Sequence, residues 1–425
     1  MGTAILIGCL FLMLILGMPI AFAVGLSSLI FLVYADSIPL QIVPMMLGNS
    51  LDSYNVIAIP FFILAAQIMN SGGVTDRMMN FAAVVVGWMK GGLAHVNILT
   101  SMLFAGMSGS AVADAAGLGQ ILIPSMKKKG YGASYSAAVT AASSTVGPII
   151  PPSVPIVMYG ILAEASINKL FLAGAVPGVV MGLAMLVLSY IIAVKYNYPA
   201  EPKPTLKLIG TATVKVIPAL LTPVIILGGM WGGVFSPTEA AGVAVGYAIV
   251  QGFLMKDLTW KNLWKCVQDS AIYSSVIMII VASASLFGWI LSTEQIPVLF
   301  ADFILQVTSN KYVVLLILNI FLLIFGCFME ILAIMLMTVP VLLPLILKLG
   351  IDPVHFGVVM VLNLMIGLLS PPFGLCLYIA QDIAGVPYAK AVKATVPYII
   401  LILFILLLAT YWPQFVLFLP NLVGG

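Results

Sequence analysis

Long apolar runs, separated by short polar loops and broken by glycines and prolines, fill most of the chain. A helix needs roughly 17–25 such residues to cross a bilayer, and the run at 4–34 is long enough even with a kink at Gly17-Met18-Pro19. The runs do not alternate between apolar and polar residues as barrel strands would. The pattern predicts an all-α integral membrane protein, with further spans at 55–72, 168–195, 212–231, 238–255, 268–292 and 394–420.

Residues 106–177 have a counterpart later in the chain. Shifted by 220 positions without a gap, Gly147 falls on Gly367 and Pro151-Pro152 falls on Pro371-Pro372. The matching residues are mostly glycine and proline, which determine where helices break or end. Two halves with one backbone plan are expected. Other matched residues are Gly106 and Gly326, Ala113 and Ala333, Pro124 and Pro344, Lys128 and Lys348, Gly130 and Gly350, and Val176-Pro177 and Val396-Pro397.

Each half is expected to contain a re-entrant helical hairpin and a broken transmembrane helix. The apolar chain on either side of each hairpin tip is short for two full crossings, which are the alternative. Short helices with polar ends, at 76–90 and 296–309, suit the membrane interface. The hairpins are expected at 91–126 (tip 106–110) and 311–346 (tip 326–330), and the broken spans at 131–165 (break 147–152) and 352–385 (break 367–372).

The composition supports a membrane protein. Hydrophobic residues make up 62% of the 425 residues and charged residues 7%, against roughly 25% charged in a soluble domain. The lysines are spread over loops without a cluster that would suggest nucleic acid binding. The four cysteines lie far apart, with no metal-ligand or redox spacing.

The lysine-rich loops all fall on one side of the predicted topology, which is expected to be cytoplasmic. These loops include 127–129, 256–265 and a proline-rich linker at 195–215. The loop that carries Asp36 and Asp52 is expected outside. Because an odd number of crossings separates the two broken spans, the second repeat should be inverted relative to the first. The N-terminus is then expected in the cytoplasm and the C-terminus outside.

The breaks have the chemistry of ion sites. Carbonyls freed at the end of one half-helix can coordinate a cation, and amides at the start of the next can face an anion. Hydroxyls and a carboxylate at the hairpin tips add hard oxygen ligands. Two cation sites are therefore expected: one from Ser108, Ser110, Gly147, Ile150 and Pro152, and one from Gly326, Phe328 (backbone only), Glu330, Gly367, Ser370 and Pro372.

A cluster of hydroxyls precedes the first break. It either lines a substrate pocket or satisfies the end of the half-helix, and Asn363 matches its first member in the second half. The candidate substrate-binding residues are Ser143, Ser144, Thr145, Pro151, Ser153, Asn363 and Pro371.

Three kinds of ionisable residue remain. Asp114 lies at predicted membrane depth, where function is the default hypothesis for a charge, and pairing within the hairpin is the alternative. His95 and His355 are not related by the shift and are interpreted as structural. Arg77, the single arginine, is expected at the cytoplasmic interface, so no guanidinium is available at the membrane centre to hold a carboxylate bidentately.

Three segments together resemble a known family. They are the run from Ser143 to Ser153 (SSTVGPIIPPS), the tip from Gly106 to Asp114 (GMSGSAVAD), and Phe328-Met329-Glu330. The chain is similar over its whole length to the large membrane subunit of tripartite ATP-independent periplasmic (TRAP) transporters. Family members often have Asp where this chain has Glu330, so the second ion site departs from the family's pattern at this residue.

The resemblance implies a sodium-driven symporter of the bacterial inner membrane with an elevator mechanism, with Na⁺ as the coupling ion and no cofactor. Its implied partners are a small four-helix membrane subunit on a separate chain and a periplasmic binding protein. The implied substrate is an organic acid such as a sialic acid, a C4-dicarboxylate or a keto acid. The implied division is scaffold at 1–90 and 166–310, transport domain at 91–165 and 311–386, and a C-terminal span at 387–425.

Two other hypotheses stand beside this one. A stand-alone dicarboxylate/sodium symporter would share the plan of inverted hairpins and would need no binding protein. An intramembrane serine protease would use Ser108 or Ser110 with His95, but the repeat duplicates the backbone break and not this pair. The chain has no Walker-type nucleotide motif. We therefore expect a transporter that does not use ATP and is not an enzyme.

Overall fold

The computed structural model describes residues 2–35, 39–71 and 73–423, with the backbone alone described at 2–4 and 106–108. Over these ranges the chain is helical and contains no strand, as predicted. Asp36 lies outside the described residues. The helices are α1 (Gly2–Ile15), α2 (Ile20–Ala35), α3 (Ile42–Leu51), α4 (Ala58–Ser71), α5 (Val74–Val86), α6 (Gly92–Ser108), α7 (Ala111–Lys128), α8 (Ala133–Ser144), α9 (Val154–Leu162), α10 (Ile167–Lys195), α11 (Leu206–Trp231), α12 (Pro237–Leu254), α13 (Trp260–Thr293), α14 (Ile296–Val307), α15 (Lys311–Gly326), α16 (Ile331–Lys348), α17 (Pro353–Gly367), α18 (Leu375–Ala384), α19 (Tyr388–Tyr411) and α20 (Pro413–Val423).

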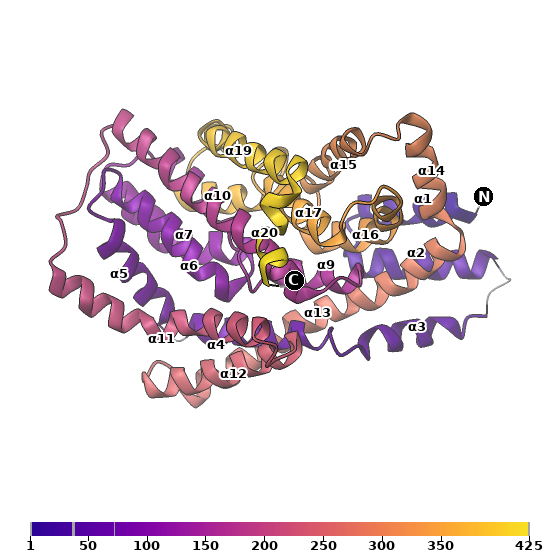
Figure 1. The fold of residues 1–425 in the computed structure, drawn as a ribbon, viewed down its shortest axis with the longest axis horizontal. Helices are drawn as coiled ribbons and strands as arrows, with labels where there is room; N and C mark the ends of the chain where they lie inside the picture. The colour runs from indigo at the N-terminus through magenta and orange to yellow at the C-terminus, as the bar shows by residue number, and fades with distance from the viewer. Residues whose placement is uncertain (1, 36–38, 72, 424–425) are drawn as a thin grey trace.

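Several helices can cross a membrane. Among the described residues, five helices are long and apolar enough by length and composition, and the number rises to seven if each of two bent pairs counts as one span. The bends are 68° between α4 and α5 and 119° between α14 and α15. Figure 1 shows α5 and α14 toward opposite ends of the molecule, with the hairpins and broken helices between them.

The helix boundaries repeat with the shift of 220 residues. Helix α7 begins and ends 220 positions before α16, and α8 and α17 begin 220 positions apart. Matched prolines lie inside matched helices, at Pro124 in α7 and Pro344 in α16, and at Pro177 in α10 and Pro397 in α19. The two halves therefore share one backbone plan. The inverted orientation of the second half relative to the membrane stays a prediction.

Each half contributes a helix to the other. Helix α9, the second part of the first broken helix, packs against α16 and α17. Its counterpart α18 packs against α7 and α8. The outer helix of each hairpin also packs on the broken helix of its own half, α6 on α8 and α15 on α17. The two hairpins and two broken helices consequently form one body, from which neither half can be removed intact.

The hairpins break where the sequence predicts. The tips are Gly109-Ser110, between α6 and α7, and residues 327–330, between α15 and α16. The four hairpin helices have 16 to 18 residues, which corresponds to roughly 24–27 Å. A hydrocarbon core is about 30 Å thick. A tip near the membrane centre would therefore require these helices to tilt, and that position stays a prediction.

Three predictions about the scaffold are wrong. Residues 4–34 are not one kinked span: they form α1 and α2, which pack against each other on either side of Gly17 (φ +79°). The N-terminus and the end of α2 therefore lie at the same end of this hairpin (Figure 1). The loop expected around Asp52 contains α3, which packs along α13. The last span, 394–420, is divided at Trp412-Pro413, because proline cannot continue the hydrogen-bonding pattern of α19.

The helices that follow the broken helices pack with the hairpins. Helix α10 contacts α6, α9 and α17, and α19 contacts α8 and α17. Helix α20 returns onto α10. The expected scaffold segment 166–310 and C-terminal span 387–425 thus begin with helices attached to the hairpin body. The division into scaffold and transport domain stays a prediction, with these helices on the transport side.

The helices α5 and α14, which correspond to the two short helices expected at the membrane interface, are called the first and second arm helices. The linker between α10 and α11 fastens the first hairpin to the first arm helix. It is shorter than predicted, because α11 begins at Leu206 and already contains Lys207 and Lys215. The amide of Gly91 donates to the carbonyl of Pro199 at 3.1 Å, and the amide of Glu201 donates to that of Gly87 at 3.0 Å. A separate ion pair joins Lys129 to Glu201.

Three tyrosine rings fix the same linker to the loop after α7. The ring of Tyr198 stacks on Tyr131 at 4.6 Å and on Tyr135 at 5.1 Å between centroids. Tyr131 also donates its hydroxyl hydrogen to the Pro199 carbonyl at 3.2 Å. The α10–α11 linker and the loop between α7 and α8 are therefore joined to each other and to the first hairpin.

The tyrosine stack predicts a stability change at high pH. Burial raises the pKa of Tyr131 to about 12 and raises that of Tyr198, against about 10 in an unfolded chain. The folded state holds these protons more tightly, so this contribution to stability is complete below pH 10 and is lost as the pH rises through the folded pKa. The unfolding temperature should fall between about pH 10 and 12. A variant with Tyr131→Phe and Tyr198→Phe should show a smaller fall, and an equal fall would contradict this role of the stack.

Candidate functional site

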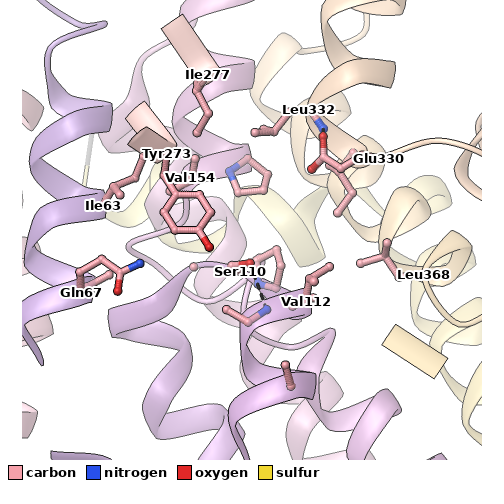
Figure 2. Close-up of a pocket in the computed structure, with 18 of the residues that line it drawn as sticks. Ile63, Gln67, Ser110, Val112, Val154, Tyr273, Ile277, Glu330, Leu332 and Leu368 are labelled. Atoms are coloured by element: carbon pink, nitrogen blue, oxygen red, sulfur yellow. Dashed lines mark hydrogen bonds between the residues drawn. The ribbon is translucent and has the colours of Figure 1, made fainter. Parts of the chain in front are cut away.

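A cavity of about 410 Å³ lies between the two hairpin tips and two neighbouring helices, α4 and α13. Figure 2 shows Gln67 and Tyr273 on one side of it, Glu330 and Leu368 on the other, and Ser110 between them. This volume falls in the range of roughly 300–1,000 Å³ that is usual for small-molecule sites. The lining residues are Ile63, Ala66, Gln67, Asn70, Gly109, Ser110, Ala111, Val112, Ala113, Ala116, Pro148, Val154, Pro155, Tyr273, Ile277, Glu330, Ile331, Leu332 and Leu368.

Three helix N-termini meet at this cavity, because the first residues of α7, α9 and α16 line it. Each helix is capped by a side chain. The Ser110 hydroxyl accepts from the amide of Ala113 at 3.4 Å, and the Ser153 hydroxyl accepts from that of Ile156 at 3.3 Å. First-turn amides and the helix dipole favour negative charge. The ends of α7 and α9 therefore suit an anionic group.

The third N-terminus differs, because its cap carries a charge. The Glu330 carboxylate accepts from the amides of Leu332 at 3.0 Å and Ala333 at 3.4 Å. Glu330 is the N-cap residue of α16 and lines the cavity (Figure 2). The side of the cavity next to Glu330 consequently suits a cation.

The polar residues that α4 and α13 place at the cavity were not predicted from the sequence. Gln67 and Asn70 are three residues apart in α4, so they lie on one face of that helix. Tyr273 of α13 is 58% exposed and lines the same space. The signal that could have found the first two is their spacing within an otherwise apolar run. The pairing of that run with the hairpin tips could not be read from the sequence.

The first hairpin tip and the first break, which supply the first predicted cation site, lie close together, and the site itself stays a prediction. A Cβ added at Gly109 (φ +57°) would stand 3.2 Å from the amide nitrogen of Val154 and 3.5 Å from the carbonyl oxygen of Pro152, so the tip touches the break. Ser110 follows Gly109 directly. The side chain of Ser108 lies outside the described residues. The half-buried Ile150 packs against Gly178 of α10. A Cβ added at Gly178 would stand 2.6 Å from Cγ1 of Ile150.

Gly147, expected in the same site, lies next to Asp114. A Cβ at Gly147 would stand 2.9 Å from Oδ2 of Asp114. Asp114 is fully buried in the first turn of α7, where the helix dipole favours a carboxylate. Asp114 does not line the cavity. Its carboxylate is thus held between the first hairpin and the first break.

Two residues of the second predicted cation site, Gly326 and Gly367, lie in close backbone contact, and the site itself stays a prediction. A Cβ at Gly367 would stand 2.3 Å from the carbonyl carbon and oxygen of Gly326, so α15 and α17 meet where neither has a side chain. The Ser370 hydroxyl donates to the Ile366 carbonyl of its own helix at 2.8 Å. The Phe328 side chain is 58% exposed and meets Phe373 edge-on, with 6.1 Å between centroids.

The two breaks differ in exposure. Pro151 and Pro152 are buried, whereas Pro371 and Pro372 are exposed. Both Pro-Pro peptide bonds are cis. The two breaks therefore share one backbone plan, but the first is buried inside the protein and the second is exposed at its surface.

The candidate substrate-binding residues do not line this cavity. Ser143 donates to Oδ1 of Asn97 at 3.2 Å and accepts from Ser101 at 3.0 Å, both on α6. In the second half Asn363 donates to Oδ1 of Asn319 on α15 at 2.8 Å. These matched positions thus tie the outer helix of each hairpin to the broken helix of the same half.

The remaining predicted substrate residues have local partners. The hydroxyls of Ser144 and Thr145 donate to carbonyls one turn back in α8, Ala141 and Ala142, each at 2.7 Å. The Ser153 hydroxyl donates to the Pro148 carbonyl, which links the two ends of the loop between α8 and α9. Contact between these seven residues and a substrate stays a prediction, and the described cavity does not include them.

The remaining ionisable residues have structural partners. His95 bonds to the Lys90 carbonyl at 3.1 Å and His355 to the Ala409 carbonyl at 2.7 Å. Arg77 forms an ion pair with Asp257, beside α12. None of these residues is among those that line the cavity, so within the described residues no cationic side chain faces it.

The helical membrane fold, the paired hairpin tips and the solute-sized cavity between them define a membrane permease. The chain belongs to the family described as "Tripartite ATP-independent periplasmic transporter, DctM component", whose profile matches residues 7–415. The resemblance seen in the sequence is confirmed. The chain is therefore an inner-membrane transport protein and not an enzyme.

Curated relatives and a solved structure agree with this assignment. The sialic acid TRAP transporter large permease protein SiaM of Vibrio cholerae is 41% identical, over 97% of each chain. The C4-dicarboxylate TRAP transporter large permease protein DctM of Pseudomonas aeruginosa is 39% identical, over 95% of this chain and 94% of its own. The crystal structure of the Alcanivorax borkumensis YdaH transporter has a TM-score of 0.65 at 14% identity, covering 88% of this chain and 89% of that one, which shows a shared fold.

The glycine contact between α15 and α17 predicts opposite changes in stability for two glycine-to-alanine variants. Gly367→Ala should force these two helices apart and lower the stability of the protein by roughly 1–3 kcal/mol, measured by thermal unfolding in detergent. Gly117→Ala in α7 meets nothing within 4 Å and should be neutral or stabilising by up to about 1 kcal/mol. Equal unfolding temperatures for the two variants would refute the close contact.

Proposed function

We propose that this chain is the permease of a sodium-coupled uptake system that moves an organic acid by an elevator motion. The observation that carries the proposal is the cavity where first turns of α7, α9 and α16 meet the scaffold helices α4 and α13. TRAP large permeases work with a periplasmic binding protein and a small membrane subunit. We propose both as the partners of this chain.

The substrate proposed is an anion that the site binds without an ion pair. Helix N-termini bind carboxylates through backbone amides, and the ends of α7 and α9 are available for this purpose. The Ser110 hydroxyl, the Gln67 and Asn70 amides and the Tyr273 hydroxyl supply further polar contacts. Sialic acid and C4-dicarboxylate relatives are almost equally similar to the chain. The proposal therefore stops at the class of organic acids.

The coupling ion proposed is sodium, held at two tip-and-break sites. The contacts of Gly109 with the first break and of Gly326 with Gly367 support these positions. At the first site the described side-chain oxygen comes from Ser110, and at the second from Glu330 and Ser370. A carboxylate is a stronger ligand than a hydroxyl and also neutralises the ion at low dielectric, where an isolated charge is costly.

An elevator motion is supported by the unequal packing of the two tips. Helices α6 and α9, which flank the first tip and break, contact α4. At the second tip Phe328 is 58% exposed, and beside the second break Phe373 is 57% exposed. The two tips share one backbone plan. A movement of the hairpins that exposes the first tip and buries the second against other helices would therefore turn the cavity toward the other side of the membrane.

Sodium coupling is tested by uptake into proteoliposomes that contain the chain and its two partners. Uptake should fail when potassium replaces sodium. Ser110→Ala should raise the sodium concentration for half-maximal uptake moderately, and Glu330→Gln should raise it more, because the ion then loses its counter-charge. Tyr247→Phe, far from the tips, serves as the control. Undiminished uptake in potassium would refute the coupling, and an unchanged sodium dependence of Glu330→Gln would make the carboxylate structural.

The inverted repeat is tested by labelling from the periplasm. Single cysteines at the matched positions Lys128 and Lys348, in a chain without its native cysteines, should react unequally, and only the second should be modified by a reagent that does not cross the membrane. Lys348 is exposed, so its label should be readily attached. Equal modification of both positions would contradict the inversion without affecting the family assignment.

A further inference from the structure

A second cavity, of about 210 Å³, lies between the N-terminal helix, the second arm helix and the second hairpin. Its walls come from α1, α13 and α14 on one side and from α15 and α16 on the other, and Thr338 is the one polar residue in the described lining. The lining residues are Ile7, Leu10, Phe11, Phe287, Leu291, Ile296, Phe300, Phe321, Phe325, Met337, Thr338, Val341 and Leu342.

The corresponding helices of the first half, α5, α6 and α7, enclose a small apolar cluster. Ala82 of α5, Val96 of α6, and Leu118 and Leu122 of α7 are buried against one another in a small apolar cluster. The first arm helix α5 packs on the outer hairpin helix α6, whereas the second arm helix α14 packs on the inner one, α16. Under the repeat shift, Thr338 stands where the first half has Leu118. The second cavity thus lies where the arm helix of the second half packs differently from that of the first.

One rim of this cavity reaches the surface of the protein. Ile7 and Phe11 are 37% and 40% exposed, while Leu10 between them is 2% exposed. In a membrane protein of this length and composition, an apolar opening on the side of the helices faces lipid. The apolar molecules available there in quantity are the chains of phospholipids, and an empty apolar space would forfeit their packing contacts.

A pair of opposite charges lies along the same helices. Lys348, at the end of α16, bonds to Asp302 of α14 at 3.1 Å, and both side chains are half exposed. The cavity residues of α16 precede Lys348 by six to eleven residues, or about 9–16 Å along the helix. This separation suits the distance from a headgroup to the middle of an acyl chain. The ammonium matches a phosphate, and the carboxylate matches the amine of an ethanolamine headgroup.

We propose that this cavity binds one acyl chain of a zwitterionic membrane phospholipid, with its headgroup at Lys348 and Asp302. The lipid chain would fill the space between the second arm and the second hairpin. The site is separate from the substrate cavity and does not depend on sodium or on an elevator motion. It makes a membrane lipid a component of the interface between scaffold and hairpin.

The test uses the full chain in nanodiscs of phosphatidylethanolamine, with a small fraction of the same lipid carrying a photoreactive diazirine near the end of one acyl chain. After illumination, peptide mass spectrometry should find labels concentrated on the segments that contain Phe300, Phe321 and Phe325, relative to the exposed faces of α11. Val341→Trp fills the cavity and should lower this labelling about tenfold, as expected for displacing about two methylene groups. Leu347→Trp, on the same helix but outside the cavity, is the matched control and should leave the labelling unchanged.

A second cavity-filling variant tests the proposal if Val341→Trp does not fold. Thr338→Leu introduces the side chain of the first half and should lower the labelling in the same direction but less. Lys348→Glu should reduce it by repelling the phosphate while the cavity stays intact. Labelling spread evenly over the surface helices, or unaffected by both cavity-filling variants, would overturn the proposal. Because uptake is not the readout, such a failure is distinguishable from failure of the transport proposal.

Discussion

A helix end inside a membrane must find partners for its backbone amides and carbonyls, because hydrocarbon offers none. This constraint accounts for the contacts at the centre of the molecule. Ser110, Ser153 and Glu330 cap three helices that begin beside the cavity. Gly109 and Gly326 allow each tip to approach a break closely enough for backbone to meet backbone. The backbone amides and carbonyls at these helix ends that need partners are also the groups that can bind an ion or a carboxylate.

Capping by two serines and a glutamate also distributes charge within the site. The amides of α7 and α9 keep their affinity for negative charge, since serine caps are neutral. At α16 the Glu330 carboxylate offsets the helix dipole and leaves negative charge at the cavity wall. A cation and an organic anion can therefore lie close together, each next to a helix end of suitable polarity. The difference between Ser110 and Glu330 at matched positions produces this polarity.

The positions of breaks could be predicted from the sequence, and the partners of side chains could not. Glycine and proline act locally, so the tips at 106–110 and 326–330 and the breaks after Gly147 and Gly367 were recognisable from the repeat alone. Whether a hydroxyl faces a cavity depends on a neighbouring helix. Ser143 was a reasonable pocket residue by type, but α6 supplies Asn97 and Ser101 as its partners. The polar residues of α4 were missed for the same reason. The helical hairpin at the N-terminus was missed because a Gly-Met-Pro break can kink a helix or reverse the chain, and packing between α1 and α2 decides which.

The exchange of α9 and α18 between the halves has an evolutionary consequence. A chain consisting of one half alone would leave the surface of its hairpin and broken helix uncovered, because the helix that covers it comes from the other half. Such a chain could complete its fold only by trading that helix with a second copy, as in a domain-swapped dimer. An ancestor of half the present length would thus have been an obligate dimer, and duplication with fusion would have made the trade permanent within one chain. Within one chain the two copies need not be identical, which allows a serine at one tip and a glutamate at the matched position of the other.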